Sequence, residues 1–112
     1  MAKLECTVHA DWRELMKAIS RGILEGSVSA SDEGHSDFSG GNARCSVQVF
    51  ERFSFIGNNR VSMTVTLFQE GDGPIQVSAI TAGGSQAMFF KINTFGEEAF
   101  LDKLREVLNA YS

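Results

Sequence analysis

Three runs of alternating apolar and polar residues fill the stretch from Arg44 to Gly83, which reads RCSVQVFERFSFIGNNRVSMTVTLFQEGDGPIQVSAITAG. The apolar residues of these runs take odd positions: Cys45, Val47, Val49, Phe53 and Phe55, then Val61, Met63, Val65 and Leu67, then Ile75, Val77 and Ala79. Side chains alternate with a period of two along a strand, so each run predicts a β-strand with one buried face. Glycine and asparagine separate the runs, which predicts an antiparallel meander of three strands.

The register of this meander follows from keeping the odd residues on one face. If Phe55 lies opposite Val61, residues Gly57-Asn58-Asn59 form a three-residue loop, a length that usually includes a left-handed residue, which asparagine tolerates. In the second hairpin, Leu67 then lies opposite Ile75. This register places the even positions on the outer face of the sheet.

A strand and a helix are predicted before the meander. Leu4, Cys6 and Val8 alternate with polar residues, which indicates a strand with one buried face. Asp11 stands three residues before Glu14, the spacing of a helix capping box. Apolar residues then recur at helical spacing up to a stop at Gly26, and they are Trp12, Leu15, Met16, Ile19 and Ile23.

The segments on either side of the meander are less regular. Residues 27–43 are rich in Ser, Gly and Asp, and we expect a short strand at 27–32 followed by a loop. The apolar segment 85–92 predicts a last strand, and Thr94 has the right position to cap a final helix. The apolar stripe of that helix is Phe100, Leu101, Leu104, Val107 and Leu108, with Tyr111 near its end.

This order of elements predicts a single α+β domain over residues 1–112, with the arrangement β-α-β(4-5)-α. Two amphipathic helices must cover the apolar face of the sheet, so both are expected on one side of a twisted antiparallel sheet. The outline is a two-layer one, like a reduced helix-grip fold. Such a likeness of architecture carries no function.

Composition narrows the class of protein. The 112 residues are 43% hydrophobic and 21% charged, values typical of a packed globular chain. The net charge is −4 and the ten Lys and Arg residues are dispersed, so we expect no nucleic-acid partner. No signal-peptide run and no stretch near the roughly 20 apolar residues of a membrane span occur, so we expect no membrane partner and a cytoplasmic location.

The outer face predicted for the meander contains three apolar exceptions, Phe50, Phe68 and Ile80, among Ser, Thr and Gln. An exposed apolar patch with a polar rim often marks an interface. Two alternatives are that a bulge turns one ring inward, or that the final segment covers the patch. The interpretation we favour is a non-enzymatic binding or assembly module, which forms a homodimer or other homo-oligomer through the sheet.

Two further candidates lie in or next to the meander. Glu51 falls in the odd, core-facing series, where burial would raise its pKa, unless a bulge exposes it or Arg52 or Arg60 pairs with it. Gly83-Gly84-Ser85 has consecutive backbone amides that an anion can accept from. The alternative there is a glycine-containing bulge or crossing between strands.

The sequence gives little support for a catalytic site or a metal site. The acids and histidine of segment 32–37 lack the spacing of an EF-hand loop or a zinc site, so no metal or cofactor is expected. Cys6 and His9 point to opposite faces of one strand, and Cys45 lies in the buried series, so no catalytic residue is assigned. The alternative function is binding of a small apolar, lipid-like ligand between sheet and helices, lined by aromatic residues such as Phe53, Phe55, Phe89 and Phe90.

The segment from Gly83 to Leu101, GGSQAMFFKINTFGEEAFL, resembles the C-terminal signature of a small bacterial domain family of unknown function. Segments 44–52 and 59–62 are similar to its central strands. The resemblance covers nearly the whole chain and implies a bacterial cytosolic protein of one domain. It implies no activity, cofactor or catalytic residue, and it directs attention to the segment from Gly83 to Glu97.

Overall fold

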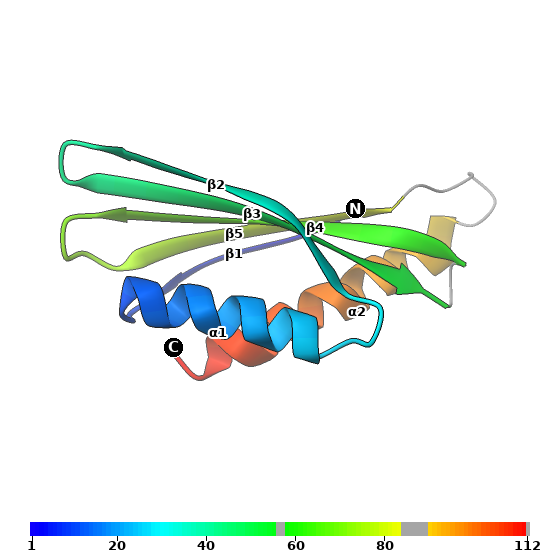
Figure 1. Ribbon diagram of the computed structural model, residues 1–112. Coiled ribbons are helices and arrows are strands. Elements are labelled where there is room, and N and C mark those ends of the chain that lie inside the picture. Colours follow the sequence, from blue (N-terminus) through cyan, green and yellow to red (C-terminus); the bar gives the residue numbers. More distant parts are fainter. Residues whose placement is uncertain (56–57, 84–89, 112) are drawn as a thin grey trace.

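The computed structural model describes residues 1–55, 58–83 and 90–111, with residues 90–95 described by their backbone alone. Within these described residues seven elements follow one another: β1 (Ala2–Val8), α1 (Trp12–Glu25), β2 (Ser31–Gly40), β3 (Ala43–Ser54), β4 (Asn59–Glu70), β5 (Ile75–Gly83) and α2 (Phe90–Asn109). The strands form one antiparallel sheet in the order β1-β5-β4-β3-β2. Both helices lie on the same side of it, so the predicted two-layer α+β fold is confirmed (Figure 1).

The first strand and first helix form as predicted. The Asp11 carboxylate accepts a hydrogen bond from the Glu14 backbone N–H at 3.0 Å, so Asp11 caps α1, and Gly26 ends it. The buried stripe of α1 consists of Trp12, Leu15, Ile19 and Ile23. These side chains fill the core between the helices and the sheet together with the buried stripe of α2, which consists of Phe100, Leu101, Leu104 and Leu108.

The two helices approach each other closely at Gly22. A Cβ atom added at this position of α1 would lie 2.3 Å from Cγ2 of Val107 on α2. Any side chain at this position would therefore overlap Val107, because carbon atoms in van der Waals contact lie about 3.5–4.0 Å apart.

A strand followed by a loop was predicted over residues 27–43, and this order was wrong. The structure has a connection at residues 26–30 and then a ten-residue strand, β2, where a loop was expected. β2 is an edge strand and almost entirely exposed, so it has no apolar alternation to reveal it. It forms by pairing with β3 through a two-residue turn, in which Gly41 takes a left-handed φ of 57°.

β2 also contains a β-bulge between Asp32 and Gly34. Gly34 has a φ of 147°, which favours glycine over other residues. The Asp32 carboxylate accepts the Gly34 N–H at 2.9 Å and so stabilises the bulge. Bulges of this kind bend and twist an edge strand locally.

The predicted register between β3 and β4 was wrong by an odd number of residues. Phe50 pairs with Met63, and the hairpin closes at Ser54 and Asn59, so four residues lie between the strands instead of three. Asn58 takes the left-handed conformation expected of an asparagine in this turn, with φ 52°. Because side chains alternate, the change turns every side chain of β3 to the opposite face.

The second hairpin keeps the predicted faces but shifts by two residues. Leu67 pairs with Val77 rather than with Ile75. An even shift preserves which side chains point inward, so Ile75, Val77 and Ala79 are buried as predicted. Gly71 begins the turn with a left-handed φ of 56°.

The final helix begins earlier than predicted. Residues 90–92 belong to α2 rather than to a strand, and residues 85–89 of the predicted strand lie outside the described residues. Thr94 lies within the helix, so it is not the N-cap. Phe90 and Ile92 are residue types common in strands, and their helical conformation here reflects continuity with the amphipathic sequence that follows.

Candidate interface on the open sheet face

β3 has its more apolar side turned away from the helices. Its helix-facing side contains one large apolar residue, Phe50, among polar residues. On that side the Ser46 hydroxyl and the Gln48 carbonyl oxygen are buried and have no hydrogen-bond partner in the described part of the chain. Its other side presents Cys45, Val47 and Val49. We call the side of the sheet away from the helices the open face (Figure 1). The open face therefore contains the apolar residues of β3 that the sequence pattern assigned to the core.

The centre of the open face is a three-by-three array of side chains on β3, β4 and β5, which we call the central grid. Its rows are Cys45–Phe68–Gln76, Val47–Thr66–Ser78 and Val49–Thr64–Ile80. None of these residues is charged, in a chain in which 21% of residues are. Protein surfaces are usually richer in charge, at about 25–35%. The central grid is thus less charged than the chain as a whole.

Phe68 is the single aromatic residue of the central grid. It lies between two open hollows, one of about 420 Å³ toward Gln76 and Thr7 and one of about 270 Å³ toward Phe38 and Cys45. Phe38 on β2 extends the same row and is 63% exposed. Two exposed rings beside two hollows make this end of the open face both apolar and uneven.

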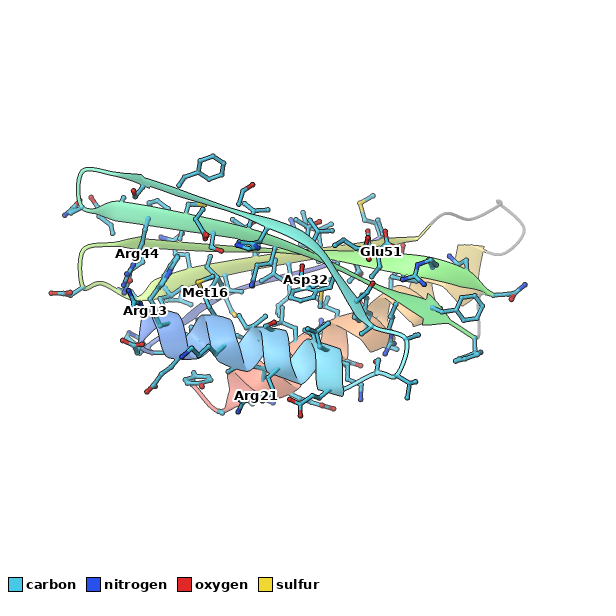
Figure 2. The ribbon with its side chains drawn as sticks, in the orientation of Figure 1. Arg13, Met16, Arg21, Asp32, Arg44 and Glu51 are labelled. Atoms are coloured by element: carbon cyan, nitrogen blue, oxygen red, sulfur yellow. The ribbon has the colours of Figure 1, made fainter. Side chains whose placement is uncertain are left out.

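Charged residues on the open face lie toward its margins, and four of them form ion pairs. Lys3 and Glu5 on β1 approach to 3.3 Å, and Arg60 approaches Glu51 to 2.8 Å. Glu51 is only partly buried and projects on the side away from α1 (Figure 2). It is therefore not in a core-facing series, because the register of β3 is inverted, and its pairing with Arg60 matches one of the alternatives foreseen.

The three apolar exceptions expected on the outer face divide into two groups. Phe68 and Ile80 lie on the open face and are 39% and 40% exposed. Phe50 is fully buried against the helices, so its expected place beside Phe68 in one patch was wrong. The residues that sequence reasoning missed are Phe38, Cys45, Val47 and Val49, and the single signal for them was Phe38, a lone aromatic residue within a polar segment.

The glycine-rich candidate lies at the end of β5. Gly83 donates its backbone N–H to Glu97 Oε2 at 2.9 Å, so a carboxylate of the chain itself occupies this amide. The Glu97 side chain is buried and also pairs with the N-terminal amino group. Gly84 and Ser85 lie outside the described residues.

The cysteines and histidines are dispersed. Cys6 lies half-buried on β1 and Cys45 lies on the open face of β3, with β5 and β4 between the two strands. Cys45 was expected in the core, and the inverted register explains its actual place. His35 Nε2 lies 3.8 Å from Asp37 on β2, and among the described residues no three His, Cys, Asp or Glu side chains gather as a metal site would require.

Cys6 offers a pH-dependent test of its burial. Desolvation by burial raises the pKa of this thiol, which favours the neutral form, so the reactive thiolate appears at higher pH in the folded chain than in the unfolded one. We expect the pH profile of Cys6 alkylation by iodoacetamide to lie at higher pH in buffer than in concentrated urea, as measured by mass spectrometry of the Cys6 peptide. Coincident profiles would show that burial does not act on this thiol.

None of the helices in the described part of the chain has the length and apolar character needed to cross a bilayer. Fold and site together define a small two-layer α+β domain with one apolar sheet face left uncovered by its own helices. The chain belongs to DUF6054, a family of unknown function, and matches it over residues 1–112. No curated protein and no solved structure matches the chain.

Proposed function

We propose that this protein is a non-enzymatic assembly module that pairs with a second copy of itself through the open face. The observation that supports this most strongly is the orientation of β3. Its polar side faces the helices, and its apolar side faces outward into the uncharged central grid. Burial of apolar area is the main favourable term in protein association. Covering the apolar side of β3 with another surface would therefore lower the free energy.

The area of the open face suits a dimer of ordinary size. Five strands spaced about 4.8 Å apart and averaging roughly 30 Å in length give a face of about 700 Å². Standard protein interfaces bury about 800 Å² on each partner. The open face thus provides nearly the area that a stable pair requires.

Charge also favours a second copy of the chain over a strongly charged partner. The chain has a net charge of −4, which opposes close approach of two copies in general. The central grid has no charge, and Lys3 and Arg60 at its margins are each paired with an acid of the same chain. Two copies that meet at the grid therefore bring no unpaired like charges together at the centre.

Stacked sheets pack about 10 Å apart with interdigitating side chains. In a two-fold pair each copy offers the same residues, so the rings of Phe38 and Phe68 in one copy meet the hollows beside Phe68 in the other. The rings provide the anchors and the hollows provide the complementary shape. This is the arrangement of an aromatic hot spot.

Sedimentation velocity over low to high micromolar concentrations tests the proposal. We expect the wild-type chain to sediment as a dimer at the upper end, and Phe68→Glu to sediment as a monomer throughout, because it would bury a charge within the interface. Phe55→Glu is the matched control, because Phe55 is 84% exposed and lies outside the central grid. It should dimerise as the wild type does.

Two outcomes contradict the proposal. One is a wild-type chain that remains monomeric at high micromolar concentration. The other is a Phe68→Glu variant that dimerises as well as Phe55→Glu, which would place the contact elsewhere. Circular dichroism of each variant shows whether it is folded, so that loss of association is not confused with unfolding.

A further inference from the structure

A pocket of about 380 Å³ opens where β3 ends, between residues 26–30 and α2. The residues that line it are Ser27, Val28, Ser29, Arg52, Phe53, Ser54, Phe55, Gly96 and Ala99. Gly96 brings the backbone of α2 close to β3, since a Cβ atom there would lie 2.6 Å from Ser54 Oγ. The pocket thus depends on a close helix–sheet contact. Its volume falls within the usual range for small-molecule sites, about 300–1,000 Å³.

Arg52 is the one basic residue among the described residues that line this pocket. Its guanidinium lies 4.9 Å from the centre of the Phe100 ring, and its Nη1 donates a hydrogen bond to Ser27 Oγ at 2.8 Å. Its Nε is buried and has no hydrogen-bond partner among the described residues. Within the described part of the chain, no carboxylate lies within ion-pair distance of it.

Arg60 and Arg105, in contrast, have acidic partners. Arg60 pairs with Glu51, and Arg105 pairs with Asp102 and Glu98. Burial lowers the pKa of Arg52, as expected for a cation that loses water without gaining an acid in return. A partly desolvated guanidinium without a counter-ion attracts an anion more strongly than a solvated one does.

Ser27 and Ser29 differ in the hydrogen-bonding capacity that they retain for a ligand. Ser29 Oγ accepts the Phe53 N–H at 3.0 Å and lies 3.5 Å from the Phe53 carbonyl oxygen, so the backbone of β3 occupies this hydroxyl. Ser27 Oγ accepts from Arg52, which leaves its own hydrogen to donate. Arg52 and Ser27 together can therefore provide both charge and a hydrogen bond to one acceptor group.

The remaining walls are apolar. Phe53 and Phe55 make an edge-to-face ring pair with centres 5.0 Å apart, and Val28 and Ala99 line the pocket with them. Phe55 and Val28 are highly exposed, although such side chains normally gain by burial. A ligand that fits both parts of the pocket has an anionic head and an apolar body.

We propose that the Arg52 pocket binds a small organic anion with a carboxylate head and an apolar body, the carboxylate on Arg52 and Ser27 and the body against Phe53 and Phe55. Guanidinium and carboxylate are matched in shape and charge, which favours this head group. The site is separate from the central grid and does not depend on the proposed assembly. Of the aromatic residues predicted to line a ligand cavity, Phe53 and Phe55 lie here, and the side chains of Phe89 and Phe90 lie outside the described residues.

Binding is measured by isothermal titration calorimetry of the full chain with octanoate. We expect saturable binding, at least about tenfold weaker binding of octanol, which lacks the charge, and no saturable binding of inorganic phosphate, which lacks the apolar body. Phosphate binding as tight as that of octanoate would overturn the proposal that the pocket selects an organic anion. Absence of saturable octanoate binding would overturn the site itself.

Arg52→Gln is expected to weaken octanoate binding at least about tenfold, because it removes the charge that the carboxylate meets. Arg13→Gln is the matched control, since Arg13 is exposed near the start of α1, away from the pocket (Figure 2). It should bind octanoate as the wild type does. Equal affinities of the two variants would contradict the role of Arg52.

A second variant covers the case in which Arg52→Gln does not fold. Val28→Asp places a negative charge at the mouth of the pocket on a fully exposed residue, where it costs little stability. We expect it to weaken octanoate binding several-fold by repulsion, whereas Asn42→Asp, at the distant β2–β3 turn, should have no such effect. Unchanged binding in Val28→Asp would contradict the location of the site.

Discussion

Replacing Phe50 with alanine is expected to lower the free energy of unfolding by about 3–5 kcal/mol, the range for removing a buried phenylalanine. Its ring is fully buried, and it is the one large apolar side chain that β3 directs toward the helices. Small domains are stable by about 5–15 kcal/mol, so this one substitution removes a large share of the total. Urea denaturation followed by circular dichroism measures the loss.

Phe68→Ala is the matched control, because Phe68 is also a phenylalanine of the sheet but is 39% exposed. At concentrations low enough for the chain to be monomeric, we expect it to cost less than about 1.5 kcal/mol, since much of its surface is already in water. Similar losses for the two variants, or a larger loss at Phe68, would contradict the inverted register of β3. The comparison therefore tests which side of β3 faces the helices.

Gly22→Ala is expected to destabilise the protein by about 1–3 kcal/mol, the range for overpacking a core. The new Cβ atom would lie 2.3 Å from Cγ2 of Val107, whose β-branched side chain has one strongly preferred rotamer in a helix. In an isolated helix the same change would stabilise by about 1 kcal/mol, because alanine has the higher helix propensity. The sign of the measured change thus reports the contact between α1 and α2.

A second substitution on the facing helix gives this prediction its control. Val107→Ala removes the Cγ2 atom and leaves Cβ, which lies 3.7 Å from the position of the new methyl group, an ordinary contact distance. We expect the double variant to be more stable than Gly22→Ala alone, and the two changes to be strongly non-additive. Additive effects in thermal and urea unfolding would rule out the close packing at Gly22.

The elements of the fold could be predicted largely because their patterns are local. The Asp11 cap and the apolar stripe of α1 follow from residue type and spacing within a few turns of helix. The face to which each β3 side chain points could not be predicted in the same way, because it depends on whether three or four residues connect β3 to β4. One residue in a turn inverts a whole strand.

β2 shows a different limit. Its ten residues include one large apolar side chain, Phe38, so no period of two marks it as a strand. It forms because β3 supplies a row of hydrogen-bonding partners and Gly41 permits the turn. The pairing is non-local and the turn depends on backbone conformation, so neither is visible in the pattern of apolar residues. For the candidate interface, Phe68 and Ile80 could therefore be identified from sequence, whereas Phe38, Val47 and Val49 required the pairing of three strands.

The bulge between Asp32 and Gly34 has a bearing on how large an assembly can become. An exposed, straight edge strand is a template on which further strands add, and this can continue without limit as a fibre. The bulge and Gly34 interrupt that template at the outer edge of β2. Growth along the sheet is thereby discouraged, whereas two copies joined face to face, as proposed above, would close on themselves and leave no free surface of the same kind for a third.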